Sequence, residues 1–281
     1  MCRVLGVTRQ GYANYKKSLN KEDKHTILLA EIKVIIEEDE FNNTYGRRRL
    51  HEALVLRGFT ESESTINRLC NKHGILKKKK KTKGLTKQSR DDYKSDDLLR
   101  GDFKADEPGR KFVTDITQLP TADGTLYISA LFDCFDNVCD GLSMDDNMKT
   151  PLVIKSVEIA SMQIPTGIKT ICHGDRGSQY TSYDFRQKLL KLGIIQSMSF
   201  AGSGCHGNAK CESMWARFKT EAIYGRYKTE LMSMDEVKSL VFRYFMGYWN
   251  HRRICSAIGG IPPMEKRRRF LANKQMNSFA A

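Results

Sequence analysis

Apolar residues recur at helical spacing through the first quarter of the chain, with charged residues on the opposite faces. This pattern predicts three helices, over residues 27–38, 47–58 and 64–74. Gly58 is placed to end the second helix, and Ser62 or Ser64 to cap the third. Short helices joined by tight turns predict a small all-α region over residues 1–76.

From residue 111 the pattern changes to runs of β-branched and aromatic residues separated by turn sequences. It predicts an antiparallel meander of three strands, over residues 111–119, 125–133 and 138–144. Alternating helices and strands then follow, over residues 150–163, 168–175, 183–192, 194–199 and from 208 onward. Strands followed by alternating elements predict an α/β fold, a mixed five-stranded sheet with flanking helices over residues 111–225.

Two segments outside this core have a different character. Residues 77–110 have the composition of a basic linker. The linker opens with a lysine block, Lys77, Lys78, Lys79, Lys80 and Lys81. Such a block is a solvated tether or a phosphate-binding arm without sequence specificity. Residues 226–281 are predicted to be a C-terminal helical extension of the core.

Composition narrows the class of protein. The 281 residues carry a formal net charge of +14, with 47 Lys and Arg against 33 Asp and Glu. This excess indicates a polyanionic partner, double-stranded DNA before an acidic membrane surface. No run of eighteen apolar residues occurs, and the first residues have no apolar signal core. We therefore expect a cytoplasmic protein whose eight cysteines are small buried hydrophobes.

The helical region contains candidate residues for binding the polyanionic partner. Three successive arginines, Arg47, Arg48 and Arg49, open its second predicted helix. Short helices with a basic edge are typical of a helix-turn-helix module that contacts DNA. A three-helix bundle with a solvated basic face has the same pattern.

Two acids occupy positions that a soluble fold normally leaves apolar. Asp115 lies inside the strand sequence FVTDIT, and Asp175 lies just past the strand residues Ile168–Cys172, between Gly174 and Gly177. An acid within a strand is costly unless it is paired, hydrogen-bonded or bound to a cation. Alternatively, Asp115 simply faces solvent on an edge strand.

A third acid, Glu212, lies on the helix that begins near Asn208. Lys219 follows it by two helical turns, so both side chains share a face of that helix. A carboxylate with a lysine two turns away suits a DNA backbone that passes over both. A solvated charged helix edge is the alternative.

These three blocks carry a resemblance. The sequences FVTDIT, HGDRGSQYTS and SMSFAGSGCHGNAKCES resemble the catalytic blocks of DDE-type insertion-sequence transposases, the integrase-like group made from two overlapping reading frames. The order and the spacing of the acids also fit. CRVLGVTRQGY and YGRRRLHEAL resemble the preceding helical region, and YWNHRRICSAIGGIPP resembles the closing motif, so the resemblance covers nearly the whole chain.

The resemblance implies a ribonuclease-H-like catalytic core in which Asp115, Asp175 and Glu212 bind two Mg²⁺ or Mn²⁺ ions. It implies DNA strand cleavage and strand transfer at the ends of an insertion sequence. Lys219, Asn250 and Arg253 would contact DNA. The protein would act on element ends and target DNA as a homo-oligomer, alone or fused to an upstream-frame product. Its place would be the bacterial cytoplasm, in association with the nucleoid.

The chain departs from the family pattern at several positions. Gly207 replaces a usual aspartate, Phe112 a usual tryptophan and Cys255 a common histidine, and one extra residue lies within 201–204. Two other functions therefore stay open beside the transposase. One is an inactive DNA-binding remnant or repressor, and the other is a nuclease that hydrolyses DNA without joining it.

Overall fold

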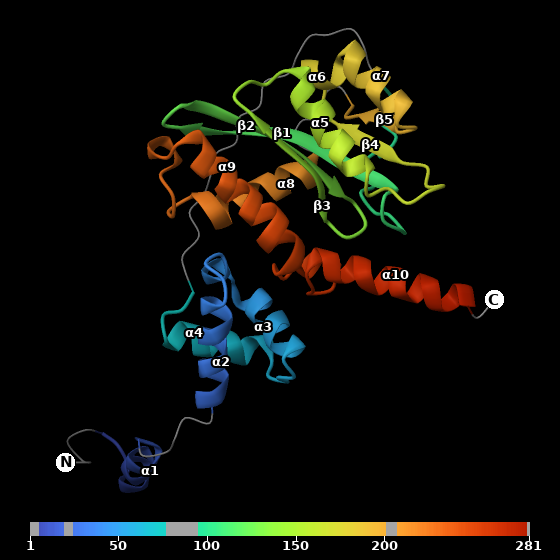
Figure 1. The fold of residues 1–281 in the computed structure, drawn as a ribbon. Helices are drawn as coiled ribbons and strands as arrows, with labels where there is room; N and C mark the ends of the chain where they lie inside the picture. The colour runs from blue at the N-terminus through green and yellow to red at the C-terminus, as the bar shows by residue number, and fades with distance from the viewer. Residues whose placement is uncertain (1–5, 20–24, 77–94, 201–206, 280–281) are drawn as a thin grey trace. The chain divides into compact units, whose positions relative to one another are not determined.

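The computed structural model describes residues 6–19, 25–76, 95–200 and 207–279. The chain forms two compact units, Met1–Lys77 and Lys78–Ala281 (Figure 1). None of the helices within the described ranges is long and apolar enough to cross a membrane.

The first unit is helical, as its sequence pattern predicts. It contains α1 (Arg9–Leu19), α2 (Thr26–Glu37), the 3₁₀ turn η1 (Asn42–Thr44), α3 (Arg47–Leu56) and α4 (Glu63–Lys72). Apolar residues three or four positions apart on α2, α3 and α4 form the buried core of this unit, among them Leu28, Ile32, Ile35, Leu50, Leu54, Ile66 and Leu69.

The predicted helix ends are found in this unit. The Ser62 hydroxyl accepts a hydrogen bond of 3.3 Å from the Thr65 N–H and caps α4. Gly58 follows α3 with a φ of +87°, the left-handed conformation that glycine adopts at little cost.

The second unit is built on a mixed five-stranded sheet. Its strands are β1 (Lys111–Thr121), β2 (Gly124–Asp133), β3 (Cys139–Asp145), β4 (Ile171–Gly174) and β5 (Ile195–Met198). They lie in the order β3-β2-β1-β4-β5. β1, β2 and β3 form the predicted antiparallel meander, whereas β4 pairs in parallel with both β1 and β5.

One face of the sheet is covered by α5 (Thr150–Ser161), α6 (Ser178–Thr181) and α7 (Tyr183–Lys191) (Figure 1). Phe112 and Leu131 from the sheet meet Val153 and Val157 of α5 and Phe185 of α7 in one apolar cluster. Burial of these side chains drives the packing of the helices onto this face.

The opposite face carries an aromatic layer. Phe132 follows Leu131 in β2 and therefore points to the other side of the sheet. Its ring lies 5.8 Å from Trp215, 5.6 Å from Phe245 and 5.9 Å from Trp249. These partners come from α8 (Ala209–Phe218) and from a π-helical turn, η5 (Arg243–Trp249), that continues α9 (Met234–Phe242).

Three further elements complete the C-terminal part, which is helical as predicted. They are the short turns η4 (Thr229–Leu231) and η6 (Ser256–Ile258) and the long helix α10 (Pro263–Phe279). Cys211, Trp215, Phe218 and Ala222 are all buried and recur at helical spacing. After Phe218 the helix widens into the π-helical segment η3 (Lys219–Ile223).

The segment expected to be a flexible linker is ordered in its described part. The Ser95 hydroxyl donates to the Gln196 carbonyl at 2.9 Å, and the Leu98 N–H donates to the Ser197 hydroxyl at 3.0 Å. Residues 95–98 therefore belong to the β5 edge of the sheet rather than to a tether. Residues 77–94, which include Lys77–Lys81, lie outside the described residues.

Candidate active site

Asp115 and Asp175 are brought together by the parallel pairing of β1 with β4. Val113 lies opposite His173 in that pairing, and each aspartate stands two residues farther along its own strand direction. Both carboxylates are half-buried and accept a short backbone bond, Asp115 from the Ile116 N–H at 2.8 Å and Asp175 from the Gly177 N–H at 2.9 Å.

Glu212 reaches the same region from the first turn of α8, where its side chain is exposed. The start of this helix is tied to the sheet. The Asn208 side-chain amide donates to the Thr114 carbonyl at 2.9 Å, directly beside Asp115. The Asn208 side chain makes no capping bond at the start of α8 and anchors the helix to β1 instead.

His173 makes a second tie between the strands and α8. Its Nε2 lies 2.9 Å from the Gly207 carbonyl, and its Nδ1 lies 2.8 Å from the Ser197 hydroxyl. Because only a protonated nitrogen can donate to a carbonyl, Nε2 carries the proton. Sequence reasoning missed this residue, although its place two positions before Asp175 was a signal.

Electrostatic interactions link Asp115 to three other candidate residues, Asp175, Glu212 and Lys219. Burial raises the pKa of Asp115 to about 8, and the negative charges of Asp175 and Glu212 add to this rise. The positive charge of Lys219 and the Ile116 N–H act against it. Burial also raises the pKa of Asp175 and lowers the pKa of Lys219, whose ammonium is favoured by Asp115.

The donor set fits a hard divalent cation. Asp115, Asp175 and Glu212 supply carboxylate oxygens, the ligands that Mg²⁺ and Mn²⁺ prefer. Burial, more than the neighbouring charges, raises the pKa of Asp115, so a bound cation would stabilise the charged form of this carboxylate. Across the described ranges, however, no three His, Cys, Asp or Glu side chains form a ready-made metal cluster.

The backbone turn that carries Lys219 is held by a buried ion pair between Glu221 and Arg253. Lys219 begins the π-helical segment η3, whose Glu221 accepts two bonds of 2.7 Å from the Arg253 guanidinium and one of 2.8 Å from the Tyr244 hydroxyl. Arg253 also lies over the Trp249 ring, 4.6 Å from its centre. These contacts fix the backbone turn that carries Lys219.

Asn250 and Arg253 are therefore not placed as DNA contacts, in contrast to the expectation from the resemblance. Arg253 is 1% exposed and is engaged with Glu221. Asn250 is 5% exposed and exchanges two bonds with the Cys139 backbone, at 2.9 and 3.1 Å. Both side chains stabilise the interior, where a DNA backbone does not reach them.

The three arginines of the helical unit are at its surface. Arg47 and Arg48 are exposed and form ion pairs with Glu63 at 2.9 Å and Glu52 at 3.3 Å. Arg49 is half-buried and stacks over the Tyr45 ring, 4.7 Å from its centre.

The cysteines match the expectation. Cys70, Cys134, Cys139, Cys172, Cys211 and Cys255 are buried free thiols, and Cys2 and Cys205 lie outside the described residues.

Two domain families match the chain. Residues 105–203 match the integrase core domain, and residues 22–83 match an HTH-like domain. The first match covers the strands that carry Asp115 and Asp175, and the second covers α2, α3 and α4.

Relatives resemble the chain along nearly all of its length. An insertion element IS600 protein of 31 kDa from Shigella sonnei is 29% identical over 273 residues, which cover 96% of this chain and 98% of that one. Transposase InsF for insertion sequence IS3A from Escherichia coli is 28% identical, and the match covers 97% of this chain and 94% of that one. A probable transposase for IS1353 from Shigella flexneri is 29% identical, and the chain spans 50% of its length.

Among solved structures, the intasome of simian T-cell lymphotropic virus in complex with a PP2A regulatory subunit is similar, with 15% identity and a TM-score of 0.49. The alignment covers 76% of this chain and 69% of that one. Sequence matches and sheet topology together confirm the expected resemblance. The chain carries an HTH-like domain followed by an integrase core domain, and its homologues are insertion-sequence transposases.

Proposed function

We propose that this protein is the transposase of an insertion sequence, which cuts DNA at the element ends and joins those ends to a target. The observation that carries the proposal is the convergence of Asp115, Asp175 and Glu212 from β1, β4 and α8. The integrase core match and the transposase relatives support the same function.

The three carboxylates would hold two Mg²⁺ or Mn²⁺ ions. Such ions activate an oxygen nucleophile and stabilise the leaving oxygen in phosphoryl transfer. Asp115 and Asp175 come from neighbouring strands of a rigid sheet, which keeps the two donors at a fixed separation. Asn208 and His173 hold the start of α8, so Glu212 enters the site from a helix whose position is set by the sheet.

Lys219 would bind a backbone phosphate next to the carboxylates. It is half-buried, and its ammonium is attracted by Asp115. A lysine in this place offsets part of the phosphate charge that three acids would otherwise repel. The Glu221–Arg253 pair fixes the turn from which it extends.

The helical unit would bind double-stranded DNA through Arg47, Arg48 and Arg49. Exposed ion pairs such as Arg47–Glu63 contribute little stability, so a phosphate can replace the carboxylate at small cost. The Lys77–Lys81 block, at the start of the proposed linker, would add contacts without sequence preference. Cutting and joining two element ends calls for more than one active site, which fits a homo-oligomer on DNA.

The test uses pre-cut element ends with Mg²⁺ or Mn²⁺ and a target plasmid. We expect Asp115→Asn, Asp175→Asn and Glu212→Gln each to reduce strand transfer by at least about 10³-fold, because each removes a charged metal ligand from the reaction. DNA binding in EDTA is expected to stay near the wild-type level.

The same assay separates the other functions. Hydrolysis without joining identifies a nuclease, and salt-sensitive binding without any metal-dependent cleavage identifies a DNA-binding remnant. Normal joining of element ends to the target by any of the three variants would contradict the assignment of the substituted residue as a metal ligand.

A further inference from the structure

A small recess lies on the flank of α8 away from Glu212. It has a volume of about 150 Å³ and is lined by Lys210, Ser213 and Arg217 from α8, with Asn137, Trp249 and Cys255 among its other walls. None of its described lining residues is acidic.

The recess and the carboxylate site use different faces of the same helix. Lys210 and Arg217 are two turns apart, so they share one face, as do Glu212 and Lys219. The two pairs are offset by two residues, which is about 200° around the helix axis. The buried stripe of Cys211, Trp215 and Phe218 lies between them.

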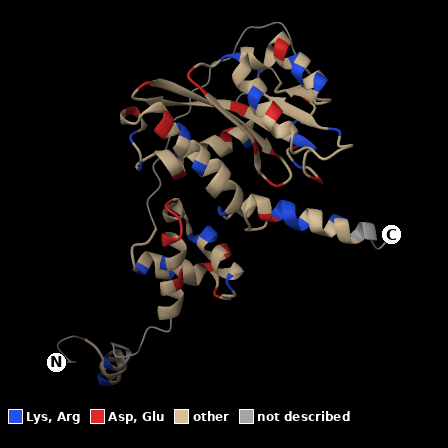
Figure 2. Cartoon of the chain, viewed as in Figure 1, with Lys and Arg blue, Asp and Glu red and all other residues tan. Residues whose placement is uncertain are grey.

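Positive charge gathers at this recess from two elements. The Lys210 ammonium donates to the Cys134 carbonyl at 2.9 Å, and the Lys266 ammonium donates to the next carbonyl, that of Phe135, at 2.5 Å. Lys266 opens the basic run Lys266–Arg269 near the start of α10, the blue band in Figure 2. Two ammonium groups on successive carbonyls repel each other.

The electrostatics agree with this crowding. The pKa of Lys266 is lowered by burial and by the charge of Lys210, while Asp136 acts against this shift. Lys210 also occupies the first turn of α8, where the helix dipole disfavours a cation. Asp136, whose effect on Lys266 is larger than that of Lys210, stabilises this pair of cations, and a bound phosphate would add to that stabilisation.

Arg217 completes the arrangement. It is exposed, its Nε donates to the Ser213 hydroxyl at 3.3 Å, and its guanidinium carries further donors. The lining is apolar at Met214, Trp249, Cys255 and Ala257, and beside these residues Lys210, Ser213 and Arg217 supply the donors that a phosphate group would use.

We propose that this recess, between Lys210 and Arg217, binds a backbone phosphate of DNA at a place separate from the carboxylate site. The proposal rests on the proposed function for its choice of DNA as the phosphate source. Binding here would hold a second stretch of DNA on the flank of α8 opposite the one that carries Glu212 and Lys219.

The test measures binding of the full-length protein to a DNA duplex in EDTA across a range of salt concentrations. Each phosphate contact contributes about 0.9 to the slope of log K against log salt. We expect Arg217→Gln to lower the slope by about that amount and the Lys210→Gln/Arg217→Gln double variant by about twice as much. Arg217→Lys, which keeps the charge, should retain the wild-type slope.

The matched control is Lys169→Gln/Lys191→Gln, which removes two exposed charges of the same unit away from the recess. Thermal melts check that each variant is folded. If the double variant does not fold, the Arg217→Gln variant is used alone. An unchanged slope in Arg217→Gln, or an equal loss in the control, overturns the proposal. Since the binding assay contains no metal, these outcomes are independent of whether the protein joins DNA ends.

Discussion

Asp115 is a candidate metal ligand with a strongly perturbed titration. Burial and the neighbouring acids raise its pKa to about 8 in the folded protein, against about 3.9 in an unfolded chain. Between these two values the folded state binds a proton that the unfolded state releases. Its contribution to stability is therefore fully present below about pH 4 and is lost as the pH rises through about 8.

We expect the melting temperature of the metal-free protein to fall between pH 5 and pH 8 and then to level off. Asp115→Asn should make the melting temperature depend less on pH and should raise it at pH 8 by roughly several degrees. The control is Asp235→Asn, since the Asp235 side chain is 91% exposed. Thermal melts in EDTA provide the measurement, and parallel curves for Asp115→Asn and the wild type would contradict the assignment.

Asp115 could be singled out as a candidate from the sequence, because an acid inside a β-strand stands out against its neighbours, whereas Glu212 and Lys219 were chosen mainly through the resemblance. Asn208 and His173 could not be predicted in their roles. Each bonds a backbone carbonyl, of Thr114 and Gly207 respectively, that lies far away along the chain. Because every residue has a backbone carbonyl, the sequence does not show which carbonyl a distant side chain will bind.

At the scale of elements, the contact between β3 and α5 depends on a single glycine. A Cβ atom on Gly141 would lie 2.1 Å from the Ser156 carbonyl oxygen in α5. That oxygen belongs to a helix backbone and moves only if α5 shifts. The glycine therefore sets how closely this helix lies on the sheet.

We expect Gly141→Ala to destabilise the protein by about 1–3 kcal/mol, the usual range for overpacking a core. Gly247→Ala is the matched control, because an added methyl there meets only the end of the Arg252 side chain at 3.7 Å. Denaturant unfolding at equilibrium gives both values. Equal stabilities for the two variants would show that α5 tolerates the shift.

Helical and strand periodicity predicted most elements to within a few residues, including the meander and the parallel β4 and β5. It failed where a helix changes its pitch. The segment after Phe218 continues the apolar spacing of α8, yet it forms a π-helical turn. The turn is held by Arg253, 32 residues farther along the chain, through Glu221. Local spacing contains no information about such a partner.

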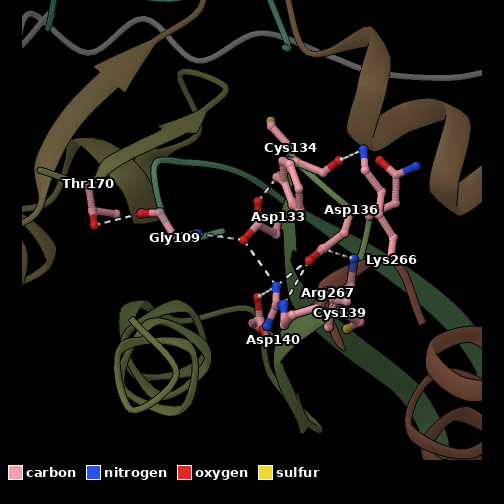
Figure 3. A network of polar contacts seen from close by, with 12 residues as sticks. Gly109, Asp133, Cys134, Asp136, Cys139, Asp140, Thr170, Lys266 and Arg267 are labelled. Atoms are coloured by element: carbon pink, nitrogen blue, oxygen red, sulfur yellow. Dashed lines mark hydrogen bonds and ion pairs between the residues drawn. The ribbon is translucent and has the colours of Figure 1, made fainter. Parts of the chain in front are cut away.

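At the scale of the whole molecule, one arginine fastens the last helix to the sheet. Arg267 of α10 is 8% exposed and forms ion pairs with Asp133 at 3.0 Å, Asp136 at 2.7 Å and Asp140 at 2.6 Å. Figure 3 shows its guanidinium group among these three carboxylates, which lie on and between β2 and β3. Burial and the charge of Asp136 raise the pKa of Asp133 to about 7, against the effect of Arg267.

We expect Arg267→Met to cost about 3–5 kcal/mol at pH 8, because it leaves buried carboxylates without their cation. The loss should be smaller at pH 5, where protonation neutralises carboxyls whose pKa is raised. Arg268→Met is the control, since that side chain is 70% exposed and pairs only with Glu265 within its own helix. Denaturant unfolding at both pH values tests this, and a pH-independent loss would count against the network.

The order in which the chain builds its site has a consequence for synthesis on the ribosome. A nascent chain that has reached residue 200 contains every strand of the sheet but lacks Glu212 and Lys219. The turn that carries Lys219 gains its ion-pair partner only when Arg253 has been made. The turn between β2 and β3, which carries Asp136, gains its partner only with Arg267. The candidate carboxylate site is therefore completed only when residues Glu212 to Arg253 have been made, after all five strands of the described sheet.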